Sequence, residues 1–230
     1  LVNGIMIPIS AWLINKFSSK KLYITAMSTF LIGTIICFVA QDFGMLLTGR
    51  LVQAAGVGVS MPLLQTIMLS IFPPEKRGAA MGTTGIVIGL APALGPTLSG
   101  WIIDSYTWRD LFGMVIPIVV LVLILASFLM KNVIQLSNPS IDVLSVILST
   151  LGFGSLLYGF SSVGDKGWGS PQVYGFLIVG AIVLCLFTYR QLHLEQPFLE
   201  LRVFKSKVFT VAAILSGVTN MAMIGAEMVL

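Results

Sequence analysis

Charged side chains and cysteines are scarce in this chain of 230 residues. Only 10% of the residues are Asp, Glu, Lys or Arg, whereas 57% are hydrophobic, and the mean hydropathy is +0.99. A water-soluble domain of this length cannot bury so much apolar surface in a single core. The two cysteines, Cys37 and Cys185, both lie in apolar runs, which favours packing over a disulfide or a metal site. The composition therefore indicates an integral membrane protein.

The chain also lacks the residue clusters on which enzymes depend. Its one histidine, His193, lies between two leucines in a polar linker, and we assign it no function. The sequence shows no nucleophile–base pair, no metal-ligand cluster and no phosphate-binding loop. It therefore favours a protein that is not an enzyme and has neither cofactor nor metal. The net charge of +4 is distributed as expected for membrane topology rather than for nucleic-acid binding.

Uncharged runs separated by short polar turns predict an all-α integral membrane fold. A helix needs about 20 apolar residues to cross the ~30 Å of hydrocarbon, and about seven runs approach that length. We expect spans at Leu22–Ala40, Met45–Phe72, Ala79–Ile103, Leu111–Met130, Val143–Val163, Val173–Tyr189 and Val208–Leu230. Leu1–Phe17 is expected to be the rest of an earlier helix. Because the chain opens in apolar sequence without Met, we also expect it to be a fragment.

The basic residues predict which loops face the cytoplasm. If the spans alternate, one set of loops holds only two basic residues, Arg109 and Lys166. The other set holds ten: Lys16, Lys20, Lys21, Lys76, Arg77, Lys131, Arg190, Arg202, Lys205 and Lys207. Cytoplasmic loops of membrane proteins carry an excess of Lys and Arg. The loops with ten basic residues are therefore predicted to be cytoplasmic.

One cation lies inside an expected span. Arg50 is about five residues, roughly 7 Å, from the outer end of its helix, where an unpaired charge is costly. Gln53, Val57, Met61 and Gln65 continue broadly the same side. Polar, methionine and small residues suit the wall of a wet, adaptable cavity. The pattern predicts that Arg50 belongs to a transport pathway with these residues lining a substrate cavity; snorkelling of Arg50 to the outer interface is the alternative.

Glycines and prolines are concentrated in the apolar stretch from Gly85 to Gly100, GIVIGLAPALGPTLSG. Such content would break a soluble helix, but in a bilayer small residues let helices approach closely and neighbours satisfy the groups that proline frees. The spacing alone favours ordinary membrane packing, and a more specific role depends on the rest of the chain. The residues concerned are Gly85, Gly89, Pro92, Gly95, Pro96 and Gly100.

These motifs resemble those of a known family. The segment GRLVQAAGVGVSMP, with Arg50, Gln53, Gly56 and Pro62, resembles the fourth-helix motif of major facilitator transporters. GLAPALGPTLSG resembles the fifth-helix motif of their antiporter branch. WRDLFGMVIP, which begins at Trp108, resembles the start of the sixth helix in the 14-helix drug:proton antiporters of the EmrB/QacA type. The likeness extends over essentially the whole chain.

The resemblance implies a fold and an arrangement of domains. The chain would be a fragment of the major facilitator fold that runs from the second helix to the ninth, with the first helix missing. Residues 1–130 would form most of the N-terminal six-helix half. Residues 131–207 would be a linker that carries two extra transmembrane helices, and residues 208–230 would begin the C-terminal half.

The resemblance also implies a function. Members of this family export drugs in exchange for protons by alternating access, which confers drug resistance. Arg50 would take part in proton coupling, and Glu227, deep in the last span, would be a second candidate. The expected partners are protons, the lipid bilayer, the remaining helices of the full-length transporter, and drug-like amphipathic compounds, cationic ones among them. The expected location is the plasma membrane of a bacterium.

Two other functions remain open on the sequence. A uniporter or importer of the same fold would also have these helices and Arg50. A non-transporting sensor or assembly module would fit if the chain were complete. The loop after the second helix departs from the family pattern, because AWLINKFSSKK has Asn15 where an acid is usual. The predicted cytoplasmic gate, formed by Asn15, Lys16, Lys20 and Lys21, therefore keeps its basic character without the acid.

Overall fold

The computed structural model describes residues 2–134, 136, 142–194, 197 and 199–229. This part of the chain consists of helices and short connections, without a strand. The helices are α1 (Val2–Lys16), α2 (Ser19–Phe38), α3 (Phe43–Ile71), α4 (Pro74–Ser105), α5 (Asp110–Leu129), α6 (Val143–Ser161), α7 (Val163–Lys166), α8 (Pro171–His193), the 3-10 helix η1 (Leu201–Lys205) and α9 (Lys207–Val229). The expectation of an all-α fold is confirmed.

Most of these helices are long and apolar enough to cross a membrane. Six spans meet that description in the described residues, formed by α2, α3, α4, α5, α6 with α7, and α8. The predicted membrane protein is therefore confirmed. Helix α4 begins at Pro74, ahead of the expected Ala79, because proline at the first helical position needs no partner for a backbone N–H. Helix α8 likewise continues past Tyr189 to His193.

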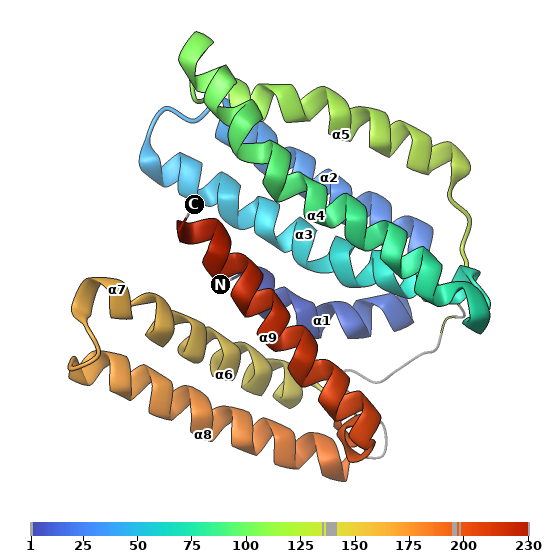
Figure 1. Ribbon diagram of the computed structural model, residues 1–230, viewed down its shortest axis with the longest axis vertical. Helices are drawn as coiled ribbons and strands as arrows, with labels where there is room; N and C mark the ends of the chain where they lie inside the picture. The colour runs from blue at the N-terminus through green and yellow to red at the C-terminus, as the bar shows by residue number, and fades with distance from the viewer. Residues whose placement is uncertain (1, 135, 137–141, 195–196, 198, 230) are drawn as a thin grey trace.

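Six of the helices pack side by side in the order α5, α2, α3, α1, α6, α8 (Figure 1). Helix α2 packs against both α3 and α5, and α3 packs against α1 on its other side. The pair α6 and α8 forms a tight hairpin that meets the rest of the bundle through α1. The two helices of the predicted linker thus lie at one edge of the row rather than inside it.

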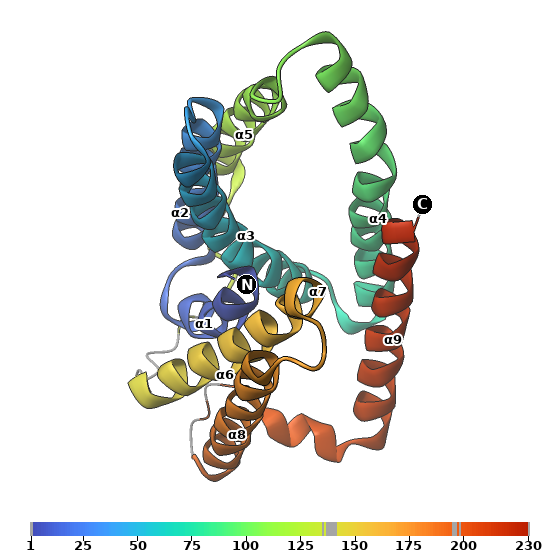
Figure 2. The same ribbon diagram turned by 90° about the vertical axis from the view of Figure 1, so that its left-hand side faces the viewer.

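Helices α4 and α9 lie apart from this row. Figure 2 shows both on the same side of it, and α4 makes sparse contacts with α3 and α5. Within α4, Ala80 and Ile102 are buried near its two ends, whereas the residues between them are mostly exposed. Helix α9 is joined to the rest mainly through η1. The middle of α4 therefore presents a free surface in this chain.

Successive connections alternate between the two ends of the bundle. Figure 1 shows the α2–α3 and α4–α5 connections and α7 at one end, and the α1–α2, α3–α4 and η1–α9 connections at the other. The ten basic residues of the predicted cytoplasmic loops belong to the second set of connections or to the helix ends beside them. The prediction of cytoplasmic loops from the basic residues assumed that successive spans alternate in direction, and this arrangement has that alternation.

Hydrogen bonds between distant segments tie the bundle together at both ends. At one end the Asn132 side chain accepts hydrogen bonds from Ser19, and the Lys20 ammonium donates to the Ser127 carbonyl in the last turn of α5 at 2.6 Å. At the other end Arg109 donates through Nε and Nη2 to the Ala40 carbonyl, at 2.9 and 2.7 Å. These contacts join α2 to α5 at both ends.

Candidate functional site

The site is built on the close approach of α2 and α3. A Cβ added at Gly33 would lie 2.6 Å from the backbone nitrogen of Gln53 and 2.7 Å from the carbonyl oxygen of Gly49. A Cβ at Gly56 would lie 2.5 Å from the carbonyl oxygen of Ala26. Such distances leave no room for a side chain, so the two backbones touch at these glycines. Glycine at these positions therefore sets the spacing of α2 and α3.

Gln53 uses this close approach to link the two helices. Its side chain is 6% exposed, and its Nε2 donates to the Thr34 hydroxyl on α2 at 2.8 Å. The Thr34 hydroxyl in turn donates to the Phe30 carbonyl at 2.8 Å. The Gln53 Oε1 accepts from Nη1 of Arg50 at 3.2 Å. Both polar atoms of the Gln53 side-chain amide thus have a hydrogen-bond partner. The hydrogen bonds from Arg50 to Gln53 and from Gln53 to Thr34 form a relay that connects α3 to α2 and orients the guanidinium.

Arg50 carries the unbalanced charge of this site. The side chain is exposed in this chain, and the ion pairs in the described part, Arg190–Asp142 and Arg202–Glu200, lie elsewhere. Its hydrogen bond to Gln53 orients the guanidinium without neutralising it. The second residue predicted for proton coupling, Glu227, has a side chain outside the described part of the chain. A role for Glu227 beside Arg50 therefore stays a prediction.

The predicted cavity residues divide into two groups. Val57 and Met61 line a groove of about 240 Å³ between α2 and α3. Gln53 faces α2, as described above, and the exposed Gln65 does not line this groove. The remaining lining residues are Tyr23, Met27, Phe30, Ser60 and Leu64. The groove is thus walled by methionine and aromatic side chains, a surface that adapts to apolar ligands of different shape.

The glycines of the predicted antiporter motif have no neighbours in the described part of the chain. A Cβ added at Gly85, Gly89, Gly95 or Gly100 would meet no atom within 4 Å. Helix α4 continues through Pro92 and Pro96. These residues form an open small-residue face on α4, and its contact with another helix stays a prediction.

The predicted cytoplasmic gate residues make separate contacts. Asn15 donates to the Ala11 carbonyl of its own helix at 3.0 Å. The Lys16 ammonium lies 4.6 Å from the centre of the Trp12 ring. Lys20 binds the end of α5, as described above, and Lys21 is exposed. The gate residues are brought together as a basic end of the bundle, and Asn15 bridges no helices.

A polar cluster at the base of the α6–α8 hairpin was not predicted. Asp142 forms a two-point ion pair with Arg190, with Nε–Oδ2 and Nη2–Oδ1 distances of 2.9 and 3.0 Å. The fully buried Gln191 donates to the Ser145 hydroxyl at 2.6 Å and accepts from the backbone N–H of Leu199 at 2.9 Å. Hydrogen bonds from Arg190 chiefly, and from Ser145, lower the pKa of Asp142 to about 2, against the opposing effect of its partial burial. The cluster joins the start of α6 to the end of α8, and through Gln191 it holds Leu199 against this pair of helices.

Two kinds of residue were missed by sequence reasoning, for different reasons. Thr34 lies in an uncharged run and gives no signal of its own, since its role depends on which residue of α3 faces it. Asp142 and Arg190 are 48 residues apart, but each lies at the end of an expected span. An acid and a base at neighbouring ends of an antiparallel helix pair are a usable signal.

In the described residues, no group of His, Cys, Asp and Glu has the arrangement of a metal site. The described residues place a cation at the interface of α2 and α3, an adaptable groove beside it and an open glycine face on α4.

Residues 1–229 match the family model of the Major Facilitator Superfamily. The chain is 55% identical to the uncharacterized MFS-type transporter YcnB of Bacillus subtilis, over all of this chain and 49% of YcnB. It is 44% identical to the lincomycin resistance protein LmrB of Listeria monocytogenes, over the whole chain and 49% of that protein. It is 30% identical to the multidrug export protein EmrB of Escherichia coli, over the whole chain and 45% of EmrB.

The chain thus spans about half the length of the curated relatives it matches. These relatives confirm the resemblance to transporters of the EmrB type that the motifs suggested. Together with the apolar helices, the bacterial relatives make this a multi-pass protein of a bacterial plasma membrane. The chain belongs to the major facilitator superfamily.

Proposed function

We propose that this chain is part of a secondary transporter that exports drug-like amphipathic molecules in exchange for protons by alternating access. Residues 1–130 are proposed to be most of the N-terminal half. Residues 131–207 are the linker with two additional helices, and residues 208–230 begin the C-terminal half. The observation that carries the proposal is the guanidinium of Arg50, which is hydrogen-bonded to Gln53 in a membrane-spanning helix and has no ion-pair partner among the described residues.

A cation in this position is suited to proton coupling. Ionisable groups inside a membrane are costly and are retained where they serve a pathway. A guanidinium stabilises the ionised form of a carboxylate beside it, and a carboxylate that moves away from it binds a proton more readily. A change in the distance between Arg50 and an acid would therefore convert a helix movement into proton uptake or release. The relay through Gln53 and Thr34 holds the guanidinium in place for this step.

Two further observations support export of amphipathic compounds. The groove beside Val57 and Met61 is apolar and adaptable, which suits bulky ligands of varied shape. The relatives LmrB and EmrB are named for lincomycin resistance and for multidrug export.

The open glycine face of α4 supports a sliding contact with the opposite half, because small residues allow close approach without interlocking side chains.

The test uses full-length protein in everted membrane vesicles. Uptake of lincomycin and of a lipophilic cation is measured with and without an imposed proton gradient. We expect gradient-dependent uptake in the wild type and its loss in Arg50→Gln, with normal amounts of protein in the membrane. Lys76→Gln, at an exposed basic position at the start of α4, serves as the matched control. Uptake that ignores the gradient would favour a uniporter, and full uptake by Arg50→Gln would contradict the role of Arg50.

A further inference from the structure

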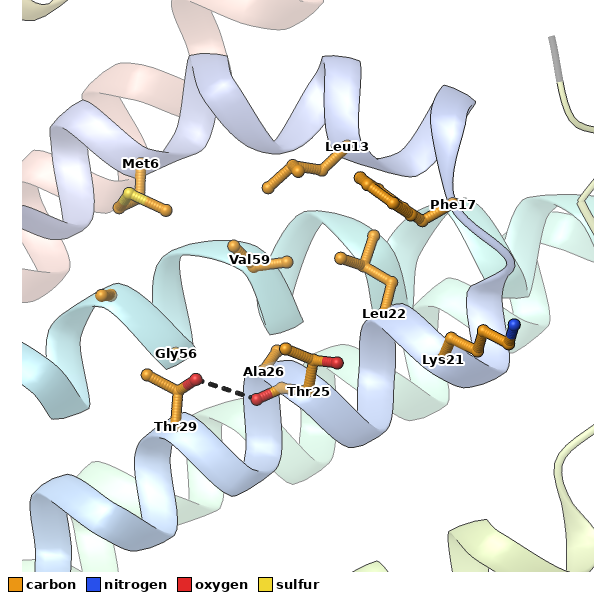
Figure 3. A pocket seen from close by; sticks show the side chains of 11 residues that line it. Met6, Leu13, Phe17, Lys21, Leu22, Thr25, Ala26, Thr29, Gly56 and Val59 are labelled. Atoms are coloured by element: carbon orange, nitrogen blue, oxygen red, sulfur yellow. Dashed lines mark hydrogen bonds between the residues drawn. The ribbon is translucent and has the colours of Figure 1, made fainter. Parts of the chain in front are cut away.

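A second groove opens among α1, α2 and α3, and the proposed transport function does not use it. Its volume is about 290 Å³. Met6 and Leu13 of α1, together with Phe17 just beyond its end, form one wall, and Val59 of α3 is part of the opposite one (Figure 3). Its lining is therefore almost entirely apolar, although the groove lies open on the surface of the bundle.

The groove has the length of one leaflet of a bilayer. From Met6 to the end of α1 at Lys16 the wall follows ten helical steps, which is about 15 Å at 1.5 Å per residue. The hydrocarbon core of a bilayer is ~30 Å thick, so this length matches about half of that thickness. An acyl chain of a lipid in that leaflet would lie along it.

The end of the groove at the membrane surface is basic. Lys21 lines that end, close to Phe17 and Leu22 (Figure 3). The Lys20 ammonium donates to the Ser127 carbonyl and the Lys16 ammonium lies over the Trp12 ring. Within the described part of the chain, the Lys21 ammonium has neither a hydrogen-bond nor an ion-pair partner.

No acid balances these lysines along the first part of the chain. The sequence before Asp42 contains no Asp or Glu, so the charge at this end of α1 and α2 is purely positive. Phosphate groups of anionic lipids are attracted to such basic clusters, by about 1 kcal/mol for each Lys or Arg near the surface. The charge therefore complements an anionic headgroup rather than a neutral one.

We propose that this groove binds one acyl chain of an anionic glycerophospholipid, with the lipid phosphate at Lys21. Thr25 lies one turn further along α2, is exposed and lines the groove. Its hydroxyl is at the depth where the ester carbonyl oxygens of the lipid would accept a hydrogen bond. The bound lipid fills the space between α1 and the α2–α3 pair, and it stabilises the position of α1 against that pair.

Native mass spectrometry of the purified full-length protein tests this site. Phosphatidylglycerol and phosphatidylcholine with the same acyl chains are titrated separately, and the bound lipid is counted. We expect preferential retention of phosphatidylglycerol, about fivefold weaker in Lys21→Gln and unchanged in Lys76→Gln, since one basic residue contributes about a factor of five. Thr25→Trp, which fills the groove, should lower retention of both lipids.

Three results would overturn the proposal. Equal losses in Lys21→Gln and Lys76→Gln would show that only the overall charge matters. Full retention in Thr25→Trp would place the lipid elsewhere, or leave the groove to another helix. Displacement of phosphatidylglycerol by inorganic phosphate at similar concentration would show an anion site without a role for the acyl chain. None of these results bears on proton-driven export, so this proposal and the transport proposal fail independently.

Discussion

Asn132 caps the first turn of α2, although it is 113 residues away from Ser19 in the chain. Its Oδ1 accepts from the backbone N–H of Ser19 at 2.9 Å and from the Ser19 hydroxyl at 3.0 Å. The backbone N–H of Val133 donates to the same hydroxyl at 3.2 Å. A residue that follows α5 therefore satisfies a donor at the start of α2, and the two helices are joined at their basic ends.

Replacing Asn132 by leucine should destabilise the full-length protein by about 1–3 kcal/mol, because the fully buried Ser19 loses the acceptor for two donors. The measurement is thermal unfolding of the purified protein in detergent. Asn15→Leu is the matched control, since Asn15 is exposed and bonds only within its own helix. Equal unfolding temperatures for the two variants would contradict the capping role of Asn132.

Thr34→Val should impair proton-driven export and destabilise the protein by about 1–3 kcal/mol, because it leaves the buried Gln53 amide donor without an acceptor. The variant keeps the shape of the side chain, but the Arg50 guanidinium loses its fixed position. Export from everted vesicles provides the measurement. Thr48→Val is the control, because Thr48 donates only to the Gly44 carbonyl of its own helix. Equal export by the two variants would argue against the relay.

Gly33→Ala and Gly85→Ala should have opposite effects on stability. A Cβ at Gly33 would press on two backbone atoms of α3, and forcing α2 and α3 apart costs about 1–3 kcal/mol. A Cβ at Gly85 meets open space in this chain, and alanine is favoured over glycine in a helix by about 0.5–1 kcal/mol. Thermal unfolding of both variants distinguishes the cases. A stable Gly33→Ala variant would mean that α2 and α3 are not in backbone contact.

Acid should loosen the α6–α8 hairpin through Asp142. Its pKa in the folded protein is about 2, below the ordinary value of 3.8. A carboxyl group with a depressed pKa stabilises the fold above its ordinary pKa, and this contribution is lost as the pH falls from 3.8 to about 2. Unfolding temperature measured against pH should show this loss in the wild type. Asp142→Asn and Arg190→Gln should both reduce it, and an unchanged profile in either variant would contradict the assignment.

The helices and the family could be predicted from the sequence, because both depend on local signals. The length of uncharged runs locates the spans, and prolines and charges mark their ends, as at Pro73 and Lys131. The motif around Arg50 depends on residue type at fixed spacing, which one sequence displays directly. The alternation of the loops follows from the order of the spans.

Helix contacts could not be predicted in the same way. Glycine spacing drew attention to α4, yet glycines elsewhere are the ones in tight contact in this chain, among them Gly33 and Gly56 between α2 and α3 and Gly58 against α1. Small residues show that another helix can pack closely against this one, but tertiary packing decides which helix does so. Gln53 is a second example. The helical pattern placed it on the same side of α3 as Val57, but its amide faces Thr34 on α2.

The open face of α4 leads to a prediction about its role in transport. Gly95→Leu should insert and fold normally, because no described atom lies within 4 Å of a Cβ at this position. It should nevertheless lose export if α4 meets the opposite half there, since a leucine side chain cannot enter a close-packed contact. Reconstituted full-length protein with an imposed pH gradient provides the assay. Export at the wild-type rate would mean that this face meets only lipid.

Helix α4 is anchored at both ends and unsupported between them. At its start the Arg77 guanidinium holds the Phe72 carbonyl, and beyond its end Arg109 holds the Ala40 carbonyl. A rod fixed at two points and free along its middle can bow or roll about its axis with little resistance, but it cannot translate. Pro92 and Pro96 remove backbone donors in that free region, so it is also the most compliant part of the helix. We therefore expect the ends of α4 to act as pivots during transport, with its glycine face bowing between them.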